Sequence, residues 1–229
     1  MKIKVGVAVL GAMVMANVAL ASPLTDYSTG KTALDVSFES PKITDDNDTY
    51  GSTGSVNGKS IVGFGITTGL GNKFALQYKQ SSPRTKDVTT DVLNLGGGIT
   101  SINSHETVDV NEYNLLYQIN TNISVLAGVS QVKGKLQGDL SDNTNTRGLF
   151  QVGFVGSAPV ADKTTAYTTA AFGNDLTTWK LGLSYQVDKN WEMDVYYGYN
   201  KYRNLQWQTD SSQSDFTIKG VGYGISYKF

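Results

Sequence analysis

The chain has 229 residues with 19 basic and 20 acidic side chains, one histidine and no cysteine. A nearly neutral charge argues against a nucleic-acid partner held by phosphate neutralisation, and the lack of cysteine excludes disulfides, thiolate metal sites and cysteine nucleophiles. With 25 glycines, 13 tyrosines and 4 prolines, the composition suits a sheet protein with wide polar loops.

The N-terminus is predicted to be a targeting segment. Lys2 and Lys4 precede a long uncharged run that ends in the small residues around Ala21. We therefore expect a signal peptide over residues 1–21, cleaved between Ala21 and Ser22. A retained transmembrane anchor is the alternative, but the run is short and leads directly into the cleavage site.

Short stretches in which apolar residues alternate with polar ones predict β-strands along the rest of the chain. In the first of them Leu34, Val36 and Phe38 share one face, and acidic or small residues share the other. The stretch at 164–172 is the weakest, because either phase leaves Thr or Ala on the apolar face. The full series covers residues 32–39, 59–68, 73–80, 110–119, 123–132, 148–156, 164–172, 176–187, 191–199 and 221–229.

The connection at 40–58 contains an acidic stretch around Asp46 that invites a calcium interpretation. Tyr50 stands where an oxygen ligand is wanted, and Asn57 stands where a bidentate glutamate should close the site. We therefore expect a solvated loop and no metal site.

The last nine residues set Tyr223, Ile225, Tyr227 and Phe229 against small or polar neighbours. This pattern resembles the closing strand of bacterial outer-membrane β-barrels, which ends in an aromatic residue. The resemblance implies that these four residues form the signal read by the barrel assembly machinery. An amphipathic strand of a soluble sandwich is the alternative.

From these patterns we predict one domain over residues 22–229, an all-β, closed antiparallel transmembrane β-barrel of about ten strands. Eight strands would result if the weak hairpin were lost. Connections near residues 70, 121, 160 and 189 are short, and those near 48, 94, 140, 174 and 207 are mostly long. This asymmetry is typical of barrels with short periplasmic turns and longer extracellular loops. We expect a location in the bacterial outer membrane, with membrane lipid and the assembly machinery as partners and no cofactor.

The inward face of the predicted barrel carries both signs of charge. In a narrow barrel such charges would pair and close the lumen, whereas glycines on the same face remove bulk and favour a narrow channel. Accommodation of twist or bulges is the other reading of the glycines. The charges are Asp35, Glu39, Lys73, Lys79, Glu112, Lys180, Glu192, Asp194 and Lys228, and the glycines are Gly63, Gly65, Gly128, Gly182, Gly198, Gly220, Gly222 and Gly224.

His105 is the obvious catalytic candidate, in the longest expected loop at 81–107. Glu106 and Asp109 lie close in sequence, and a carboxylate can orient an imidazole as a general base. This arrangement resembles the omptin outer-membrane proteases, which use an Asp–His pair with further acids. A simple exposed loop histidine is the interpretation we favour.

Three functions follow as hypotheses. The first is a non-enzymatic barrel with a structural role or with extracellular loops that bind a ligand. The second is a small porin-like channel for ions or small polar solutes. The third is an omptin-like or lipid-modifying enzyme. A shared fold does not decide between them, and the loops around Asp46, His105 and Trp207 are where a non-channel function would lie.

Overall fold

The computed structural model describes residues 23–47, 51–93 and 99–229, so the predicted signal peptide and the cleavage site at Ala21 and Ser22 lie outside the described residues. The described part forms one antiparallel sheet, and the sheet closes because β1 (Thr32–Glu39) pairs with β4 on one side and β14 on the other. No helix in these three ranges is long and apolar enough to cross a membrane.

Ten strands make up the closed wall, as the sequence predicted. The weak stretch at 164–172 is one of them, so the eight-strand alternative is wrong. In wall order after β1, the strands are β4 (Ile61–Gly71), β5 (Phe74–Ser81), β7 (Ile99–Asn120), β8 (Ile123–Gly138), β10 (Arg147–Ala161), β11 (Thr164–Gly173), β12 (Leu176–Gln186), β13 (Trp191–Gln206) and β14 (Gln213–Lys228).

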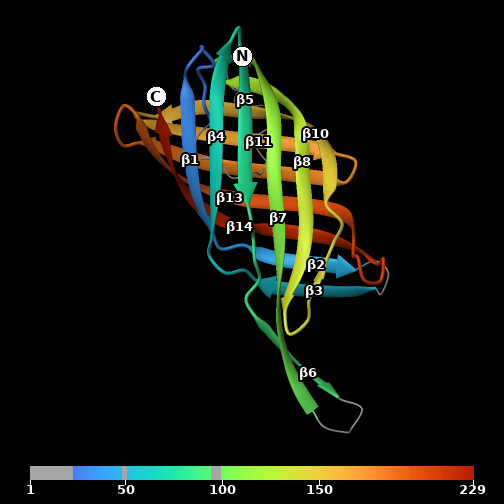
Figure 1. Ribbon diagram of the computed structural model, residues 1–229. Helices are drawn as coiled ribbons and strands as arrows, with labels where there is room; N and C mark the ends of the chain where they lie inside the picture. Colours follow the sequence, from blue (N-terminus) through green and yellow to red (C-terminus); the bar gives the residue numbers. More distant parts are fainter. Residues whose placement is uncertain (1–22, 48–50, 94–98) are drawn as a thin grey trace, which may run out of the picture.

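One end of the barrel carries short turns and the C-terminus, and the opposite end continues far beyond the wall (Figure 1). We call the first the turn end, with connections at residues 72–73, 121–122, 162–163 and 187–190, and the second the extension end.

Several stretches at the extension end that were predicted to be polar loops are strands. The prediction was wrong there because these stretches are rich in Thr, Ser, Asn and Asp, without apolar alternation. A strand with water on both faces, such as β6 (Val88–Leu93), needs no apolar face, and its backbone pairing suffices. The stretches comprise β2 (Lys42–Asn47), β3 (Ser52–Asn57), β6, β9 (Asp142–Asn143) and the outer parts of β7, β8, β13 and β14.

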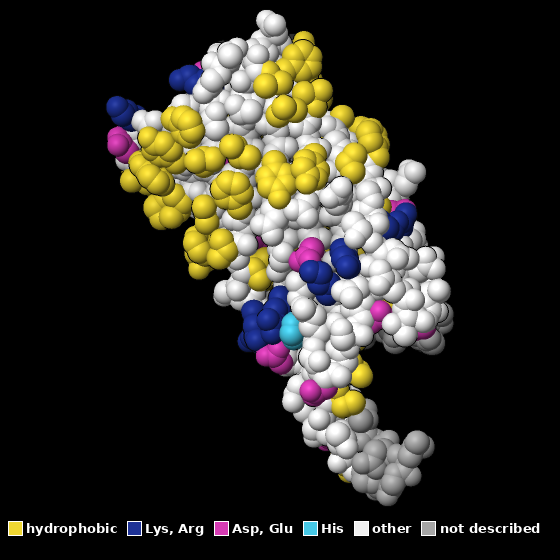
Figure 2. Space-filling view, viewed as in Figure 1, with side chains coloured by type: hydrophobic (Ala, Val, Ile, Leu, Met, Phe, Trp, Pro, Cys, Tyr) yellow, Lys and Arg dark blue, Asp and Glu magenta, His cyan; other side chains and the backbone are white. Residues whose placement is uncertain are grey.

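An apolar band surrounds the wall. Large hydrophobic side chains point outward on almost every wall strand, and charged side chains gather between this band and the extension (Figure 2). Aromatic pairs border the band: Trp191 packs on Tyr227 at 4.8 Å near the turn end, and Trp179 stacks on Tyr199 at 5.5 Å towards the extension. Aromatic girdles around an exposed apolar band are the outer surface of a membrane-spanning barrel.

Candidate functional site

The middle of the lumen is filled by a hydrogen-bonded polar layer. The Lys79 Nζ lies 3.5 Å from a Glu112 carboxylate oxygen, and the two side chains are 6% and 2% exposed. Asn114 donates to the Gln77 side-chain oxygen at 3.2 Å and accepts a hydrogen bond from Gln151 at 2.7 Å. Ser130 of β8 donates to the Gln151 side-chain oxygen at 3.1 Å, so this network joins the neighbouring strands β5, β7, β8 and β10 along one side of the lumen. Because its members are buried and partnered, they occupy the lumen with little solvent access.

A second cluster completes the layer on the other side. The Lys180 Nζ lies 3.3 Å from the centre of the Tyr196 ring, whose hydroxyl donates to Glu39 at 2.6 Å. The Tyr167 hydroxyl donates to Asp194. The lysine is fully buried between aromatic rings and carboxylates, which offset part of the cost of removing its charge from water.

Glycines make room for these side chains. Tyr196 is directly opposite Gly222 in the pairing of β13 with β14, and Tyr167 is opposite Gly182 in the pairing of β11 with β12. A Cβ at either glycine would collide with the tyrosine ring. The same relation holds for Ser37 with Gly63, Asn114 with Gly128, and Asp194 with Gly224. At these five glycines a cross-strand neighbour therefore fills the space that the missing side chain leaves.

Apolar layers close both ends. At the turn end, Leu24 and Tyr27 of the N-terminal segment are buried with the inward residues Leu116 and Leu126. At the extension end, the buried apolar residues include Ile43, Val108, Val132, Leu149, Leu176, Leu205, Trp207, Phe216 and Ile218. Buried side chains are thus present at both ends of the lumen as well as in its middle.

Most of the predicted lumen charges lie in or beside the lumen. Asp35, which accepts a hydrogen bond from Ser226, is buried together with Lys79, Glu112, Lys180 and Asp194. Half-buried positions are occupied by Glu39, Glu192 and Lys228, the last two forming an ion pair at 2.7 Å.

Lys73 is the exception among these charges, because it is exposed in the turn between β4 and β5. The prediction that it faces the lumen is corrected here. Asn72 and Lys73 have φ values of 52° and 69°, the conformation of a tight hairpin turn, so Lys73 precedes the strand and has no inward position.

Two acids meet at the mouth of the extension end, outside the apolar band. Asp45 of β2 and Glu106 of β7 share a hydrogen bond. Burial raises the pKa of Asp45 to about 6, although a hydrogen bond with Ser214 opposes the rise. Burial and the neighbouring Asp45 raise the pKa of Glu106 to about 7. The pair therefore favours at least one bound proton and links β2 to the wall.

His105 lies in β7 and not in a loop. Adjacent strand residues point to opposite faces, so Glu106 faces the mouth and His105 faces away from it. Asp109 forms its ion pair with a lysine of β8. The His105 Nδ1 lies 3.2 Å from an Asp87 carboxylate oxygen and 3.3 Å from a nitrogen of Arg84. Asp87, which the sequence pattern did not single out, is thus the carboxylate beside the imidazole.

The other two loop positions of interest are also structured. Asp46 is in β2, opposite Asp215 of β14. Trp207 is 7% exposed, packs on Phe216, and donates its ring N–H to Ser214 at 3.0 Å, so it belongs to the apolar layer at the mouth. Within the described ranges, no group of three or more His, Asp and Glu side chains is placed to hold a metal ion.

The closing strand carries its aromatic row on the outside. Tyr223 and Phe229 are 62% and 51% exposed, and Ile225 and Tyr227 continue the row between them. The backbone of Phe229 pairs with Thr32, which completes the closure of the barrel.

No known family model matches the chain, and no curated protein matches its sequence. Among solved structures, the outer membrane protease OmpT from Escherichia coli aligns over 87% of this chain and 97% of its own, with a TM-score of 0.60 and 10% identity. The chain has the fold of a bacterial outer-membrane β-barrel protein. The match also includes the translocator domain of autotransporter NalP from Neisseria meningitidis (88% and 89% covered, TM-score 0.46, 15% identity) and Ail from Yersinia pestis (86% and 99% covered, TM-score 0.38, 14% identity). Sequence identities as low as these indicate a shared fold and do not determine the activity of this barrel.

Several residues that fill the lumen of this outer-membrane barrel were not predicted from its sequence. Tyr167 and Tyr196 stand in the inward phase of their strands, and each is followed on a neighbouring strand by a glycine in the same phase. Tyr27 precedes the first strand, where no alternation marks it. The alternation within each strand predicts that these tyrosines and glycines face inward. Which tyrosine stands opposite which glycine depends on strand register, which the alternation does not give.

Proposed function

We propose that this protein resides in the bacterial outer membrane with its extension end outward, and that it acts there by binding an extracellular partner, without enzymatic activity and without a conducting lumen. The filled lumen carries this proposal. Charged, aromatic and apolar side chains occupy it in three layers, so the surfaces left for function are the outer wall and the extension.

Targeting supports the location. An uncharged N-terminal run ending at Ala21 fits export through a cleaved signal peptide, and the outward row ending in Phe229 fits recognition by the barrel assembly machinery. The first residue of β1 and the last residue of β14 both lie at the turn end. Because an exported chain reaches the outer membrane from the periplasm, we expect the turn end to stay in the periplasm and the extension to lie outside.

The β6–β7 ribbon is the strongest candidate for the binding surface. It projects from the barrel (Figure 1), and Val88, Thr89, Thr90 and Asp91 are all exposed, so both faces of β6 meet solvent. Ile99, on the other strand, is 71% exposed. A two-stranded ribbon of this kind is only marginally stable by itself, so a partner that covers it would contribute stability.

The edge of β6 suggests how such a partner binds. In the described sheet, β6 pairs with β7 alone, which leaves its other edge available. An extended peptide can add to an open edge by backbone hydrogen bonds, and side chains such as Thr89 and Asp91 then select its sequence.

The test compares the mature protein with a variant in which Asn-Gly replaces residues 89–103. Both are placed in nanodiscs and measured for binding to immobilised fibronectin, collagen, laminin, heparin and mucin. We expect the intact ribbon to bind at least one of these and the shortened variant to lose that binding while keeping the heat-sensitive gel mobility of a folded barrel. Equal binding by both would refute the role of the ribbon.

A proteolytic function is the second candidate, because the imidazole of His105 lies beside the carboxylate of Asp87 at the extension end. An Asp–His pair can activate water when a substrate reaches it. We expect a fluorogenic peptide library to remain uncleaved. Cleavage by the folded protein that His105→Ala and Asp87→Asn both abolish would establish the enzyme and exclude the non-enzymatic proposal.

A further inference from the structure

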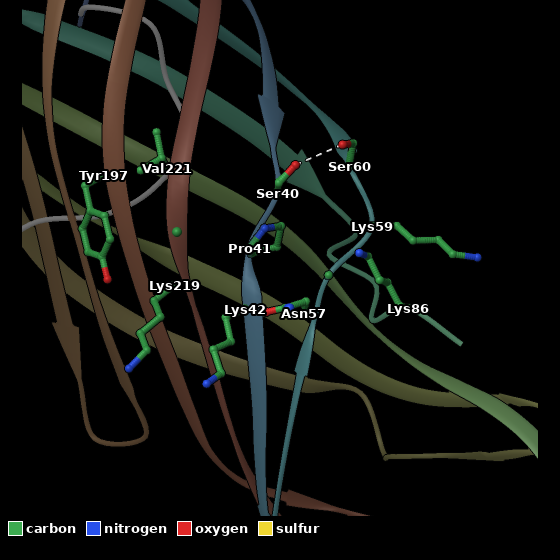
Figure 3. A pocket seen from close by; sticks show the side chains of 12 residues that line it. Ser40, Pro41, Lys42, Asn57, Lys59, Ser60, Lys86, Tyr197, Lys219 and Val221 are labelled. Atoms are coloured by element: carbon green, nitrogen blue, oxygen red, sulfur yellow. Dashed lines mark hydrogen bonds between the residues drawn. The ribbon is translucent and has the colours of Figure 1, made fainter. Parts of the chain in front are cut away.

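A hollow of about 680 Å³ opens on the outer surface where β14 changes its neighbour. Residues 222–228 of β14 pair with β1, and residues 214–219 pair with β2. Pro41 forms the corner between β1 and β2. It packs closely against Gly58 and Gly220, where an added Cβ would come within 2.5 and 2.9 Å of its backbone. Four lysines line this hollow, which we call the lysine pocket: Lys42, Lys59, Lys86 and Lys219 (Figure 3).

Two of these lysines repel one another. Lys42 and Lys219 are directly opposite in the register of β2 and β14, and their side chains point to the same side (Figure 3). Like charges placed directly opposite on neighbouring strands destabilise a sheet. Lys59 is different, since its Nζ lies 2.7 Å from the Asp87 carboxylate. The ion pairs of the described residues include neither Lys42 nor Lys219, so an anion between them would remove the repulsion.

The pocket lies at the border of the apolar band. Val221, which is 58% exposed, is opposite Tyr197 of β13, and both line the pocket on its apolar side. Two residues further towards the extension, Lys219 is opposite Tyr199, whose ring stacks on Trp179. Aromatic residues of this kind occupy the headgroup level of a membrane, so the lysines are at the depth of lipid phosphates.

We propose that the lysine pocket binds the phosphate of an anionic lipid headgroup in the outer leaflet. Ammonium groups form charge-assisted hydrogen bonds with phosphate oxygens, and Tyr197 and Val221 contact the acyl chains of the same lipid. Free phosphate would make only the contacts with the ammonium groups and would lack those with Tyr197 and Val221. The site faces the membrane, so the proposal goes beyond the binding role of the β6–β7 ribbon and does not depend on that ribbon's partner.

The test measures lipid retention by native mass spectrometry and thermal unfolding in nanodiscs of phosphatidylcholine, with or without phosphatidylglycerol. We expect phosphatidylglycerol to be retained and to stabilise the protein, and each substitution, Lys42→Gln or Lys219→Gln, to lower its retention about fivefold. In pure phosphatidylcholine the same substitutions should raise the unfolding temperature, because they remove the repulsion. The substitutions should thus raise the unfolding temperature in pure phosphatidylcholine and weaken the stabilisation by phosphatidylglycerol, a combination that a general folding defect cannot produce.

A matched control changes the same charge at the turn end, in Lys163→Gln/Lys189→Gln. If this control lowers retention as much as the double variant Lys42→Gln/Lys219→Gln does, or if that double variant retains the lipid fully, the proposal is wrong. Inorganic phosphate added to phosphatidylcholine nanodiscs separates the two sources of phosphate. Stabilisation equal to that by phosphatidylglycerol would overturn the lipid assignment, and a much smaller effect would support it.

Discussion

At the scale of single residues, the lumen is built from pairs in which a glycine faces a larger side chain on the neighbouring strand. The ring of Tyr196 lies over Gly222, and its hydroxyl reaches Glu39 on the far side of β14. The glycine thereby positions a ring that also covers the ammonium group of Lys180. Any side chain in place of the Gly222 hydrogen would displace the Tyr196 ring from both Glu39 and Lys180.

Gly222→Ala should therefore destabilise the barrel by about 1–3 kcal/mol, the usual cost of overpacking. In a Tyr196→Ala background the same substitution should cost much less, because the ring that it strikes is absent. Urea unfolding in lipid vesicles measures both effects. Gly54→Ala in β3, where an added Cβ has nothing within 4 Å, serves as the control and should change stability little. Additive costs for the two lumen substitutions would contradict the pairing.

At the scale of elements, the attachment of the β2–β3 hairpin to the barrel mouth depends on the proton held by Asp45 and Glu106. The two carboxyls have ordinary pKa values of 3.8 and 4.5, which the folded protein raises to about 6 and about 7. A folded state with the higher pKa binds more protons than the unfolded one between these limits, so its stability falls as pH rises. The attachment is strongest below about pH 4 and weakens up to about pH 7.

Hydrogen exchange of residues 40–47, corrected for the intrinsic pH effect, should therefore show less protection at pH 8 than at pH 5. Asp45→Asn/Glu106→Gln should make the protection independent of pH in this range. Residues 181–186 of β12, which lie towards the turn end, provide the internal reference. Protection that increases with pH in the unaltered protein would show that the sign is wrong.

At the scale of the whole molecule, three occupied layers predict a barrel that does not conduct. The polar layer around Lys79 and Glu112 lies between the apolar mouth and the segment around Tyr27. Ions would have to displace buried, paired side chains in each layer, and the cost of exposing one buried ion pair alone is several kcal/mol.

Folded protein added to a planar bilayer should accordingly give no discrete conductance steps, and Lys79→Ala/Glu112→Ala should remain silent because the apolar layers persist. A general porin added to the same bilayer verifies that pores are detected. Reproducible steps from the unaltered barrel, with ion selectivity that shifts in the double variant, would favour the channel hypothesis.

The sequence by itself determined the barrel wall, because each lipid-facing strand must carry apolar residues at every second position. Rows such as Leu34, Val36 and Phe38 predicted the strands and their number, and the alternation of short and long connections agreed with that count. The same alternation assigned Asp35, Lys79, Glu112, Lys180 and Asp194 to the lumen, where the structure places them. Lys73 departed from it because turn geometry, and not strand phase, decides its position.

Only the tertiary structure decided what the lumen and the extension contain. Whether Gly222 leaves a channel or receives a ring depends on its register with Tyr196, which no local pattern encodes. The strands of the extension carry few apolar residues, so backbone pairing is their main signature, and pairing partners such as Asp45 and Glu106 lie far apart in sequence. Periodicity reports the surroundings of one strand, whereas closure, carboxyl pairing and the lysine pocket arise where strands distant in the chain meet.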